Sequence, residues 1–350
     1  MPAIAHKIGR MQFGIFGGAQ AGGSSVGALM GQGFHDFVDC NVEAEALGFR
    51  GTFLVEHHFT GWHQVSATLT LLTWLAARTR TLRLGTAVMV LPWHNPVLLA
   101  EQAATLDLMS GGRLDFGVGK GYRHSEFTGF CIPPEEAEAR FEEALDVIIR
   151  SWTMPERFSH HGRFWKFEDL AVEPPTFQKP HPPIWMAAGS LASIHRVAAR
   201  GFNLILDQFA SEAQLAERIA LFRSEVTARR RVYDPGEIAV ARDMYVARSQ
   251  TEKDAAVERC FKARQQILNV SRAPGQERGS HILAYAHEKP SDANTLIGTA
   301  DEIAARLEGL RRAGVAYVIM NAGGSRGSLR RFAREIMPAF AGPPRREAMA

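Results

Sequence analysis

The sequence has few cysteines and little net charge. Its three cysteines, Cys40, Cys131 and Cys260, are odd in number and widely spaced. They fit neither a disulfide framework nor a CxxC metal site, so the sequence predicts a reducing compartment, the cytoplasm. Lys and Arg number 40 against 37 Asp and Glu, which gives a formal net charge of +3. Such a balance excludes a polybasic protein that binds nucleic acid.

Long apolar runs are also absent. The apolar runs of this chain are strand-sized and interrupted, whereas a membrane-spanning helix needs about 20 consecutive apolar residues. The N-terminal stretch MPAIAHKIGRMQFGIF contains no continuous apolar region that is followed by a small-residue cleavage site. We therefore expect no transmembrane segment, no signal peptide and no membrane partner.

The chain does have the material for a large core. It contains 350 residues, of which 46% are hydrophobic and 22% are charged, far from the composition of disordered or collagen-like chains. A rule of about 150 residues per domain suggests two domains, but an α/β barrel of this length is normally one. We expect a single domain over residues 1–340 and a C-terminal tail over 341–350.

Short apolar runs alternate with amphipathic stretches whose apolar residues stand three and four apart. The eight strand-like runs begin at residues 11, 51, 82, 113, 183, 203, 237 and 316. The helical stretches cover about 35–47, 66–77, 96–109, 135–151, 191–200, 211–230, 251–266 and 301–312, and a last one begins at 326. This alternation predicts a (β/α)₈ TIM barrel. A doubly wound sheet is the alternative, but its GxGxxG turn with a following acid is missing.

Several helix starts carry recognisable signals. Pro96 suits the first helical position, where no backbone donor is needed. Ser211 and Thr299 are good N-caps, and Glu302 stands three residues after Thr299, as a capping box requires. These signals fix three helix starts in the predicted barrel.

Two stretches interrupt the alternation. Residues 152–182, after the fourth helix, are rich in Pro and aromatic residues and alternate as a hairpin does. Residues 267–298, near the seventh strand, are polar, marked by Gly and Pro, and weakly periodic. Long irregular segments in a compact barrel are commonly lids or binding loops. We expect a hairpin insertion in the first stretch and a lid in the second.

Polar and small residues follow the second, fourth and fifth strands, where a barrel places its active site. The loops are Glu56-His57-His58, Gly119-Lys120-Gly121-Tyr122 and Gly189-Ser190-Leu191-Ala192-Ser193. The second and third loops offer backbone N–H groups, an ammonium and hydroxyls, and Arg140 adds a guanidinium, so they fit a phosphate. The alternative is that the glycines permit tight turns and Ser190 only caps a helix.

The His57-His58 pair suits acid–base chemistry near neutral pH, or metal binding together with His63. Adjacent side chains in an extended segment point to opposite sides, so one imidazole of the pair is expected to face the barrel mouth. The first strand ends without an HxH motif, and no acidic ligand set is evident. We therefore expect no metal site, which disfavours a metal-dependent hydrolase.

Three segments in order carry a resemblance to a known family. They are FLVEHHFT at 53–60, LGTAVMVLPWHNPVLLAEQAATLDLMSGGRLDFGVGKGY at 84–122 and AAGSLASIHRVAARG at 187–201. With these motifs the chain resembles the bacterial luciferase-like, flavin-dependent monooxygenase family from about Met11 to Met337.

The resemblance implies a flavin-dependent monooxygenase on a luciferase-like barrel. Such an enzyme takes reduced FMN from a partner flavin reductase, and O₂ adds to C4a of the flavin to give a peroxyflavin. The peroxyflavin attacks a small organic substrate such as an aldehyde or ketone. Relatives pair through helices on the side of the barrel, so the resemblance also implies a homodimer.

The resemblance also assigns roles to residues. His57 would be the catalytic imidazole and Glu56 its neighbour, while Ala87-Val88 would form a non-prolyl cis peptide against the isoalloxazine. The phosphate would be held by Lys120, Tyr122 through its backbone, Arg140, Ser190 and Ser193. Residues 267–298 would be the mobile lid that excludes water.

Three positions depart from the light-emitting members. Gly119 replaces a cysteine near the flavin, Gly189 replaces an acid, and Lys120 replaces an arginine, which exchanges a guanidinium fork for a point charge. Light emission with a long-chain aldehyde is therefore not expected, and the substrate cannot be transferred from the family.

Two other functions on the same barrel stay open. One is a dehydrogenase or reductase that uses the deazaflavin F420, although related F420 enzymes usually lack the EHHF motif found here at residues 56–59. The other is a flavin-binding protein without catalytic activity.

Overall fold

The eight predicted strands form a closed parallel barrel in the computed structural model, which describes residues 10–22, 31–271, 289–323 and 325–341. The barrel strands are β1 (Gln12–Gly17), β2 (Gly51–Leu54), β3 (Arg83–Thr86), β5 (Leu114–Gly119), β8 (Ile184–Ala187), β9 (Asn203–Leu206), β10 (Ile238–Val246) and β12 (Tyr317–Asn321). They pair in chain order, and the β12 pairing with β1 closes the circle. The predicted (β/α)₈ barrel is confirmed.

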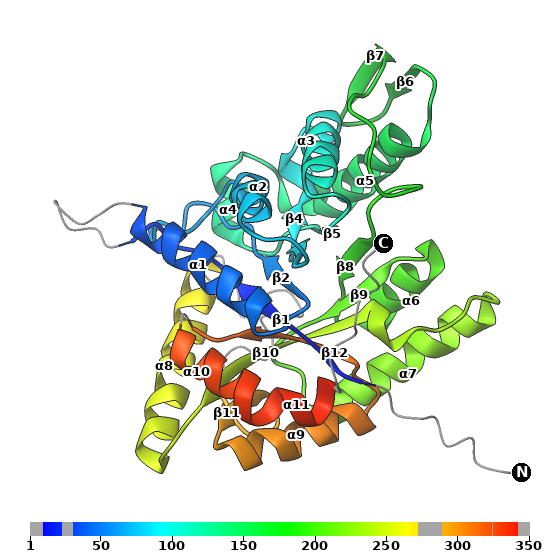
Figure 1. Ribbon diagram of the computed structural model, residues 1–350. Helices are drawn as coiled ribbons and strands as arrows, with labels where there is room; N and C mark the ends of the chain where they lie inside the picture. The colour runs from blue at the N-terminus through cyan, green and yellow to red at the C-terminus, as the bar shows by residue number, and fades with distance from the viewer. Residues whose placement is uncertain (1–9, 23–30, 272–288, 324, 342–350) are drawn as a thin grey trace, which may run out of the picture.

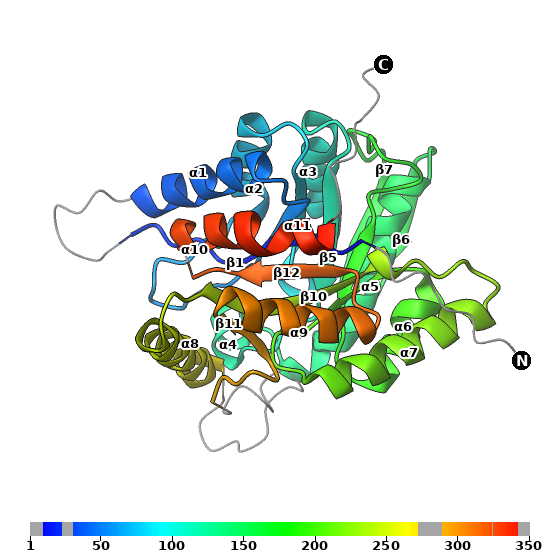
Figure 2. The same ribbon diagram turned by 60° about the horizontal axis from the view of Figure 1, so that its bottom comes forward.

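Helices surround the barrel, as Figures 1 and 2 show. They are α1 (Gln32–Ala46), α2 (Thr68–Arg78), α3 (Pro96–Met109), α4 (His124–Gly129), α5 (Ala137–Thr153), α6 (Leu191–Arg200), α7 (Glu212–Ala228), α8 (Gln250–Ser271), α9 (Ala300–Arg312), α10 (Arg326–Arg331) and α11 (Met337–Ala341). Short turns of 3₁₀ helix cover Leu91–Trp93, Pro134–Glu136 and Pro235–Glu237, and a π-helical turn covers Phe332–Ile336. Within the described ranges, no helix is both long and apolar enough to cross a membrane.

The helix starts follow the signals in the sequence. Asn95 accepts hydrogen bonds from the N–H groups of Val97 and Leu98, and Pro96 occupies the first turn of α3. Ser211 begins α7 with a capping box, and Thr299 begins α9 with another in which Glu302 bonds back to the Thr299 N–H. These side chains satisfy backbone donors that a helix terminus leaves unpaired.

Alternate strand residues fill the interior of the barrel. Phe53, Trp185, Ile205, Tyr317 and Ile319 pack there with Ala239 and Ala241, while the intervening residues pack under the helices in the main core. The alternation follows from the period of two residues along a strand. The interior is therefore a packed apolar core, and the site must lie at the mouth where the strands end.

The sequence missed two elements and joined two strands into one. The strand-like run that begins at residue 82 contains both β3 and β4 (Met89–Val90), and β4 pairs with β5 just beyond β3. The missed elements are α4, which follows β5, and β11 (Thr295–Gly298), an additional parallel strand. β11 pairs with residues 243–246 of β10, whereas β9 pairs with residues 238–240 of the same strand. The six residues of α4 make fewer than two helical turns and show no helical period, and β11 falls inside the stretch that was expected to be a lid.

The expected lid over residues 267–298 is wrong at both ends. Residues 267–271 continue α8, and residues 295–298 form β11. The apolar residues Ile267 and Leu268 pack inward and extend the helix beyond the predicted end at 266. Residues 272–288 lie outside the described residues.

The insertion after the fourth helix is the predicted hairpin. β6 (Phe158–His161) and β7 (Lys166–Leu170) pair antiparallel beyond α5, at the upper right of Figure 1. The Glu143 carboxylate of α5 accepts hydrogen bonds from the N–H groups of Phe164 and Trp165, which anchors the turn. The expected tail begins at Ala341, the last residue of α11, and residues 342–350 lie outside the described residues.

Candidate active site

A buried pair of side chains lies at the mouth of the barrel beyond β2. The Nδ1 atom of His57 is 2.9 Å from Oε1 of Glu126, whose side chain is 1% exposed. Glu126 belongs to α4, so the fold brings the ends of β2 and β5 together. The same oxygen accepts the His58 backbone N–H at 3.0 Å. These two bonds fix the imidazole against the protein.

Electrostatics set the protonation state of His57. Burial lowers the pKa of His57 below its ordinary value, and the nearby Arg123 guanidinium acts in the same direction. The hydrogen bond to Glu126 opposes this shift without cancelling it. His57 is therefore neutral near pH 7, with Nδ1–H donating to Glu126, and Nε2 is the atom that can accept a proton.

Glu56, next to His57 in the chain, accepts hydrogen bonds from a different set of donors. Its Oε1 atom accepts from Nε2 of His58 at 2.9 Å and from Nε2 of His94 at 2.7 Å, and Oε2 accepts the Val90 N–H at 2.7 Å. Burial alone would raise the pKa of the Glu56 carboxyl, but the hydrogen bonds from the two imidazoles outweigh burial and lower it. Glu56 therefore braces the segment after β3, while the two adjacent histidines bind different carboxylates.

The peptide bond between Ala87 and Val88 is cis, as the resemblance implies. Val88 lies directly over Gly119 at the end of β5. A Cβ atom at Gly119 would stand 2.5 Å from Cγ2 of Val88, which is closer than real atoms approach. Gly119 is thus required by this close packing, and a cysteine there would force Val88 to move.

Cations and hydroxyls gather at the ends of β5 and β8. Ser190 caps α6 through its Oγ atom, which accepts the Ser193 N–H at 3.2 Å, and the two hydroxyl oxygens are 2.9 Å apart. The side chains of Lys120 and Arg196 both bind the carboxylate of Glu138. Arg196 stands one turn after Ser193 on α6, so a cation that the sequence did not single out lies beside Lys120.

The predicted ligand Arg140 makes different contacts. Its Nε atom donates to Glu136 at 2.9 Å, and its guanidinium lies 4.5 Å from the ring centroid of Phe164 in the hairpin turn. These contacts do not join it to Lys120 or Ser190, so its role at a phosphate stays a prediction. Tyr122 lies near the candidate catalytic residue, with its ring centroid 6.1 Å from that of His57.

No group of three or more His, Cys, Asp or Glu side chains among the described residues could hold a metal ion. The imidazoles of His58 and His94 instead share the Glu56 carboxylate.

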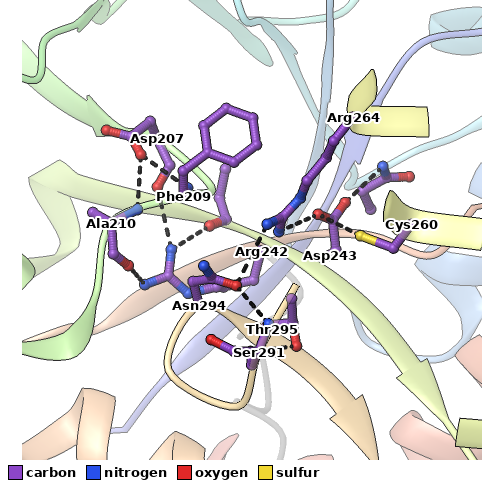
Figure 3. Close-up of polar contacts among 12 residues, drawn as sticks. Asp207, Phe209, Ala210, Arg242, Asp243, Cys260, Arg264, Ser291, Asn294 and Thr295 are labelled. Atoms are coloured by element: carbon purple, nitrogen blue, oxygen red, sulfur yellow. Dashed lines mark hydrogen bonds and ion pairs between the residues drawn. The ribbon is translucent and has the colours of Figure 1, made fainter. Parts of the chain in front are cut away.

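The sequence missed a polar cluster at the end of β10, shown in Figure 3. The Oδ2 atom of Asp243 accepts from Nη2 of Arg264 at 2.9 Å, and its Oδ1 atom accepts from Nδ2 of Asn321 at 3.1 Å. Arg242 is buried and donates to the carbonyl oxygens of Asp207 and Ala210 at 3.2 and 2.7 Å. Burial lowers the pKa of Arg242 to about 10, so the guanidinium remains charged at neutral pH.

Comparison with known proteins identifies the family and fold to which this chain is similar. The family model for luciferase-like monooxygenase matches residues 11–317. An uncharacterized protein of Sinorhizobium fredii, y4vJ, is 37% identical over 47% of this chain and 46% of its own length, so the match spans less than half of that relative. The oxygenase component of the flavin-dependent trigonelline monooxygenase of Acinetobacter baylyi is 27% identical over 85% of this chain and 87% of that protein.

Solved structures share the fold over nearly the whole chain. The monooxygenase RslO1 of Streptomyces bottropensis has a TM-score of 0.82 and 28% identity, covering 95% of this chain and 100% of that one. An F420-dependent secondary alcohol dehydrogenase has a TM-score of 0.74 at 17% identity, covering 93% and 98%. At that identity the second likeness shows the fold alone.

Proposed function

The chain belongs to the luciferase-like monooxygenase family, and from this premise we propose that it is the oxygenase of a two-component system that uses reduced FMN and O₂. The observation that carries the proposal is the pairing of His57 with Glu126, which holds a neutral imidazole in a fixed orientation at the mouth of the barrel. The cis peptide Ala87-Val88 and its contact with Gly119 follow the neighbouring strands β3 and β5.

The residues present fit FMN. Ala87 and Val88 present an apolar surface at the mouth. Gly119 packs against Val88 and has no side chain that could cover this surface. Lys120 and Arg196 are two cations that share one carboxylate, and Ser190 and Ser193 present hydroxyls at the start of a ten-residue helix. Such a combination of cations, hydroxyls and a helix N-terminus suits a terminal phosphate. A flat apolar ring and a phosphate are the two ends of FMN.

A bound reduced flavin supplies the electrons that activate O₂. The protein supplies proton transfer and a dry site. His57 accepts a proton at Nε2, and Glu126 holds its ring in place through Nδ1. The apolar barrel interior beneath the site, with Trp185 and Phe53, keeps water out of the space below the reacting groups.

The substrate is proposed only as a class, a small organic molecule such as an aldehyde or ketone. The A. baylyi relative is named for trigonelline and is itself an oxygenase component, which supports a flavin reductase as the partner of this chain. All three cysteines are free thiols, and this supports the reducing cytoplasm as the compartment.

The test is an anaerobic titration of the protein with photoreduced FMN, followed by rapid mixing with O₂ while absorbance is recorded. We expect saturable binding of reduced FMN, and then a transient absorbance that oxidised FMN does not show and that outlasts the one given by free reduced FMN. If reduced FMN does not bind, or if mixing gives oxidised FMN at the rate of the free flavin, the proposal is wrong.

A parallel titration with F420 tests the competing cofactor. The monooxygenase proposal expects F420 to bind more weakly than reduced FMN. Tighter binding of F420, with hydride transfer from an alcohol to F420, would assign a dehydrogenase to this barrel. Binding of FMN without any product over a substrate screen of aldehydes, ketones and aromatics would instead indicate a non-catalytic flavoprotein.

A further inference from the structure

Arg264 of α8 is a buried cation with unused hydrogen-bonding capacity. The residue is 1% exposed, and Nη2 donates to Asp243 at 2.9 Å. Nη1 reaches Oδ1 of Asn294 only at 3.5 Å, and Nε has no hydrogen-bond partner in the described part of the chain. A buried donor without a partner is costly, so an arginine left in this state needs an explanation.

Arg264 reaches the mouth of the barrel rather than its outer wall. Asp243 follows Ala239 and Ala241 at alternate positions of β10, and these two alanines pack in the barrel interior. Asn321 is opposite Asp243 in the register with β12 and donates to it. The Asp243 carboxylate therefore stands on the interior face at the open end, and Figure 3 shows Arg264 approaching it from α8.

Apolar contacts connect Arg264 to the candidate catalytic imidazole. Its guanidinium lies 4.9 Å from the ring centroid of Phe209, and Phe209 forms a small apolar cluster with Leu268 against which Tyr122 packs. The ring centroid of Tyr122 is 6.1 Å from that of His57. Arg264 and His57 therefore lie at the same end of the barrel, and the rings of Phe209 and Tyr122 lie between them.

Three arginine side chains gather in this cluster. Arg264 pairs with Asp243, and Arg218 pairs with Asp207. Arg242 is hydrogen-bonded to backbone carbonyl oxygens. Among the described residues, Asp243 is the one carboxylate that pairs with Arg264, and its Oδ2 atom also accepts from the Cys260 thiol at 3.2 Å.

We propose that Arg264 is a specificity-determining residue that binds a carboxylate of the organic substrate. A guanidinium offers a planar fork of donors that matches a carboxylate, and the apolar ring of Phe209 fits the carbon skeleton beside it. The oxygenated atom of the substrate then lies on the side of Tyr122 and His57. This inference rests on the proposed function for its location in a substrate site.

The experiment is isothermal titration of the purified full-length protein, without flavin, with pairs of acids and their primary amides. The probes are benzoate and benzamide, nicotinate and nicotinamide, and hexanoate and hexanamide. The wild-type protein is expected to bind at least one carboxylate about tenfold or more tightly than the matching amide, because a site built for hydrogen bonding rejects analogues that leave its donors unpaired. Arg264→Gln is expected to abolish this preference.

Two further variants make the test specific. Arg259→Gln is the matched control, because Arg259 is exposed on the same helix and lies over Tyr245 at 5.2 Å from the ring centroid. It should keep the wild-type preference. Asp243→Asn removes the counter-charge of Arg264 and is expected to strengthen carboxylate binding severalfold. Loss of packing cannot produce that gain.

The outcomes are distinct. The inference is wrong if the wild-type protein shows no preference for any carboxylate, or if Arg264→Gln retains the preference; loss of it in Lys120→Ala would then place the carboxylate at Lys120. If circular dichroism shows that Arg264→Gln is unfolded, Asp243→Asn decides, since unchanged or weaker carboxylate binding contradicts the inference.

The titration needs no flavin, so it is independent of the monooxygenase test. Reduced FMN that binds and reacts in a protein without carboxylate preference would overturn the role of Arg264 alone. Failure of reduced FMN to bind, together with an Arg264-dependent preference, would overturn the proposed function and leave a carboxylate site. If Arg264→Gln weakens reduced FMN but leaves the acid-to-amide ratio unchanged, Arg264 is a flavin ligand and the inference is wrong.

Discussion

Oε1 of Glu126 lies 2.9 Å from Nδ1 of His57 and holds the ring of the imidazole beside Tyr122. The carboxylate comes from α4 and the imidazole from the segment after β2, so the pair exists only in the folded barrel. Because Nδ1–H donates to Glu126, the free proton acceptor is Nε2. Glu126 is therefore a positioning residue for the group that we expect to move a proton.

Glu126→Gln should shift the acid limb of the pH–rate profile to lower pH. Glutamine keeps an acceptor oxygen for His57 but loses the charge that raises the pKa of the imidazole, while burial and Arg123 still lower it. The pKa of His57 falls further, so His57 stays a neutral base to a lower pH. We also expect roughly a tenfold loss in the pH-independent rate from weaker orientation.

The control for Glu126→Gln is Glu258→Gln, an exposed carboxylate on α8 paired with Lys262. It should leave the profile unchanged. A fall in rate for Glu126→Gln with no movement of the acid limb would show that Glu126 acts only on the structure of α4.

His57→Ala should lower product formation by about 10²–10⁴-fold, the usual contribution of one general acid or base. Reduced FMN should still bind with nearly unchanged affinity, because the phosphate ligands that we propose, Lys120 and Ser190, lie on other loops. Stopped-flow absorbance and product yield measure the two effects separately. Unchanged yield in His57→Ala would assign proton transfer to another group.

Gly119→Ala should destabilise the protein and weaken FMN binding together. The added Cβ would stand 2.5 Å from Cγ2 of Val88, and forcing extra volume into a packed site typically costs about 1–3 kcal/mol. Val88 must move, which displaces the apolar surface proposed for the flavin. Denaturant unfolding and fluorescence titration with FMN measure the two changes.

Gly327→Ala is the matched control for that substitution. Gly327 lies in α10, and a Cβ there meets nothing within 4 Å. Because alanine is favoured over glycine in a helix by about 1 kcal/mol, this variant should be slightly more stable, with unchanged FMN binding. Equal effects of the two substitutions would contradict the steric account of Gly119.

The order of elements was accessible from sequence because each barrel strand is an apolar run that is followed by an amphipathic helix. The loops with His57, Lys120 and Ser190 were accessible for the same reason, since strand ends in a barrel meet at one mouth. The cis bond at Ala87-Val88 came from the family resemblance, and the structure has it. Local patterns therefore sufficed where a residue follows a long, strongly patterned element.

Residues that act from short or charged helices were missed. Glu126 lies in the six-residue α4, which has no side-chain cap and too few turns to show a period. Arg264 lies in a stretch predicted only as a helix, and the end of that helix packs in a cluster with Phe209. The preference for Arg196 over Arg140 as a phosphate ligand is our proposal, and it depends on how α5 and α6 are rotated, because Arg196 binds Glu138 and Arg140 contacts Phe164. Such rotations are set by packing across the whole barrel.

Arg196→Ala and Lys120→Ala should each weaken FMN about tenfold while leaving riboflavin affinity nearly unchanged. The two flavins differ only in the phosphate, which we expect to contact these cations, and a charge-assisted hydrogen bond contributes about 1.5–3 kcal/mol. Arg140→Ala, whose guanidinium contacts Glu136 and Phe164, should have a smaller effect. A larger effect of Arg140→Ala than of Arg196→Ala would restore the assignment made from sequence.

Met109→Glu should convert a homodimer into monomers. Helix α3 carries three large apolar side chains on its outer side, Leu98, Leu108 and Met109, exposed by 53%, 40% and 65%. Exposed apolar side chains gathered on one helix mark an interaction surface, and a second copy of the chain is the occupant that the family resemblance implies. A charge at Met109 would have to be buried without a partner at such an interface, which disfavours association.

Light scattering should report a dimer for the wild-type protein and a monomer for Met109→Glu. The control Val232→Glu, on an 89% exposed residue after α7, should remain dimeric. A monomeric wild-type protein would contradict the predicted homodimer, and a dimeric Met109→Glu would place the interface on other helices.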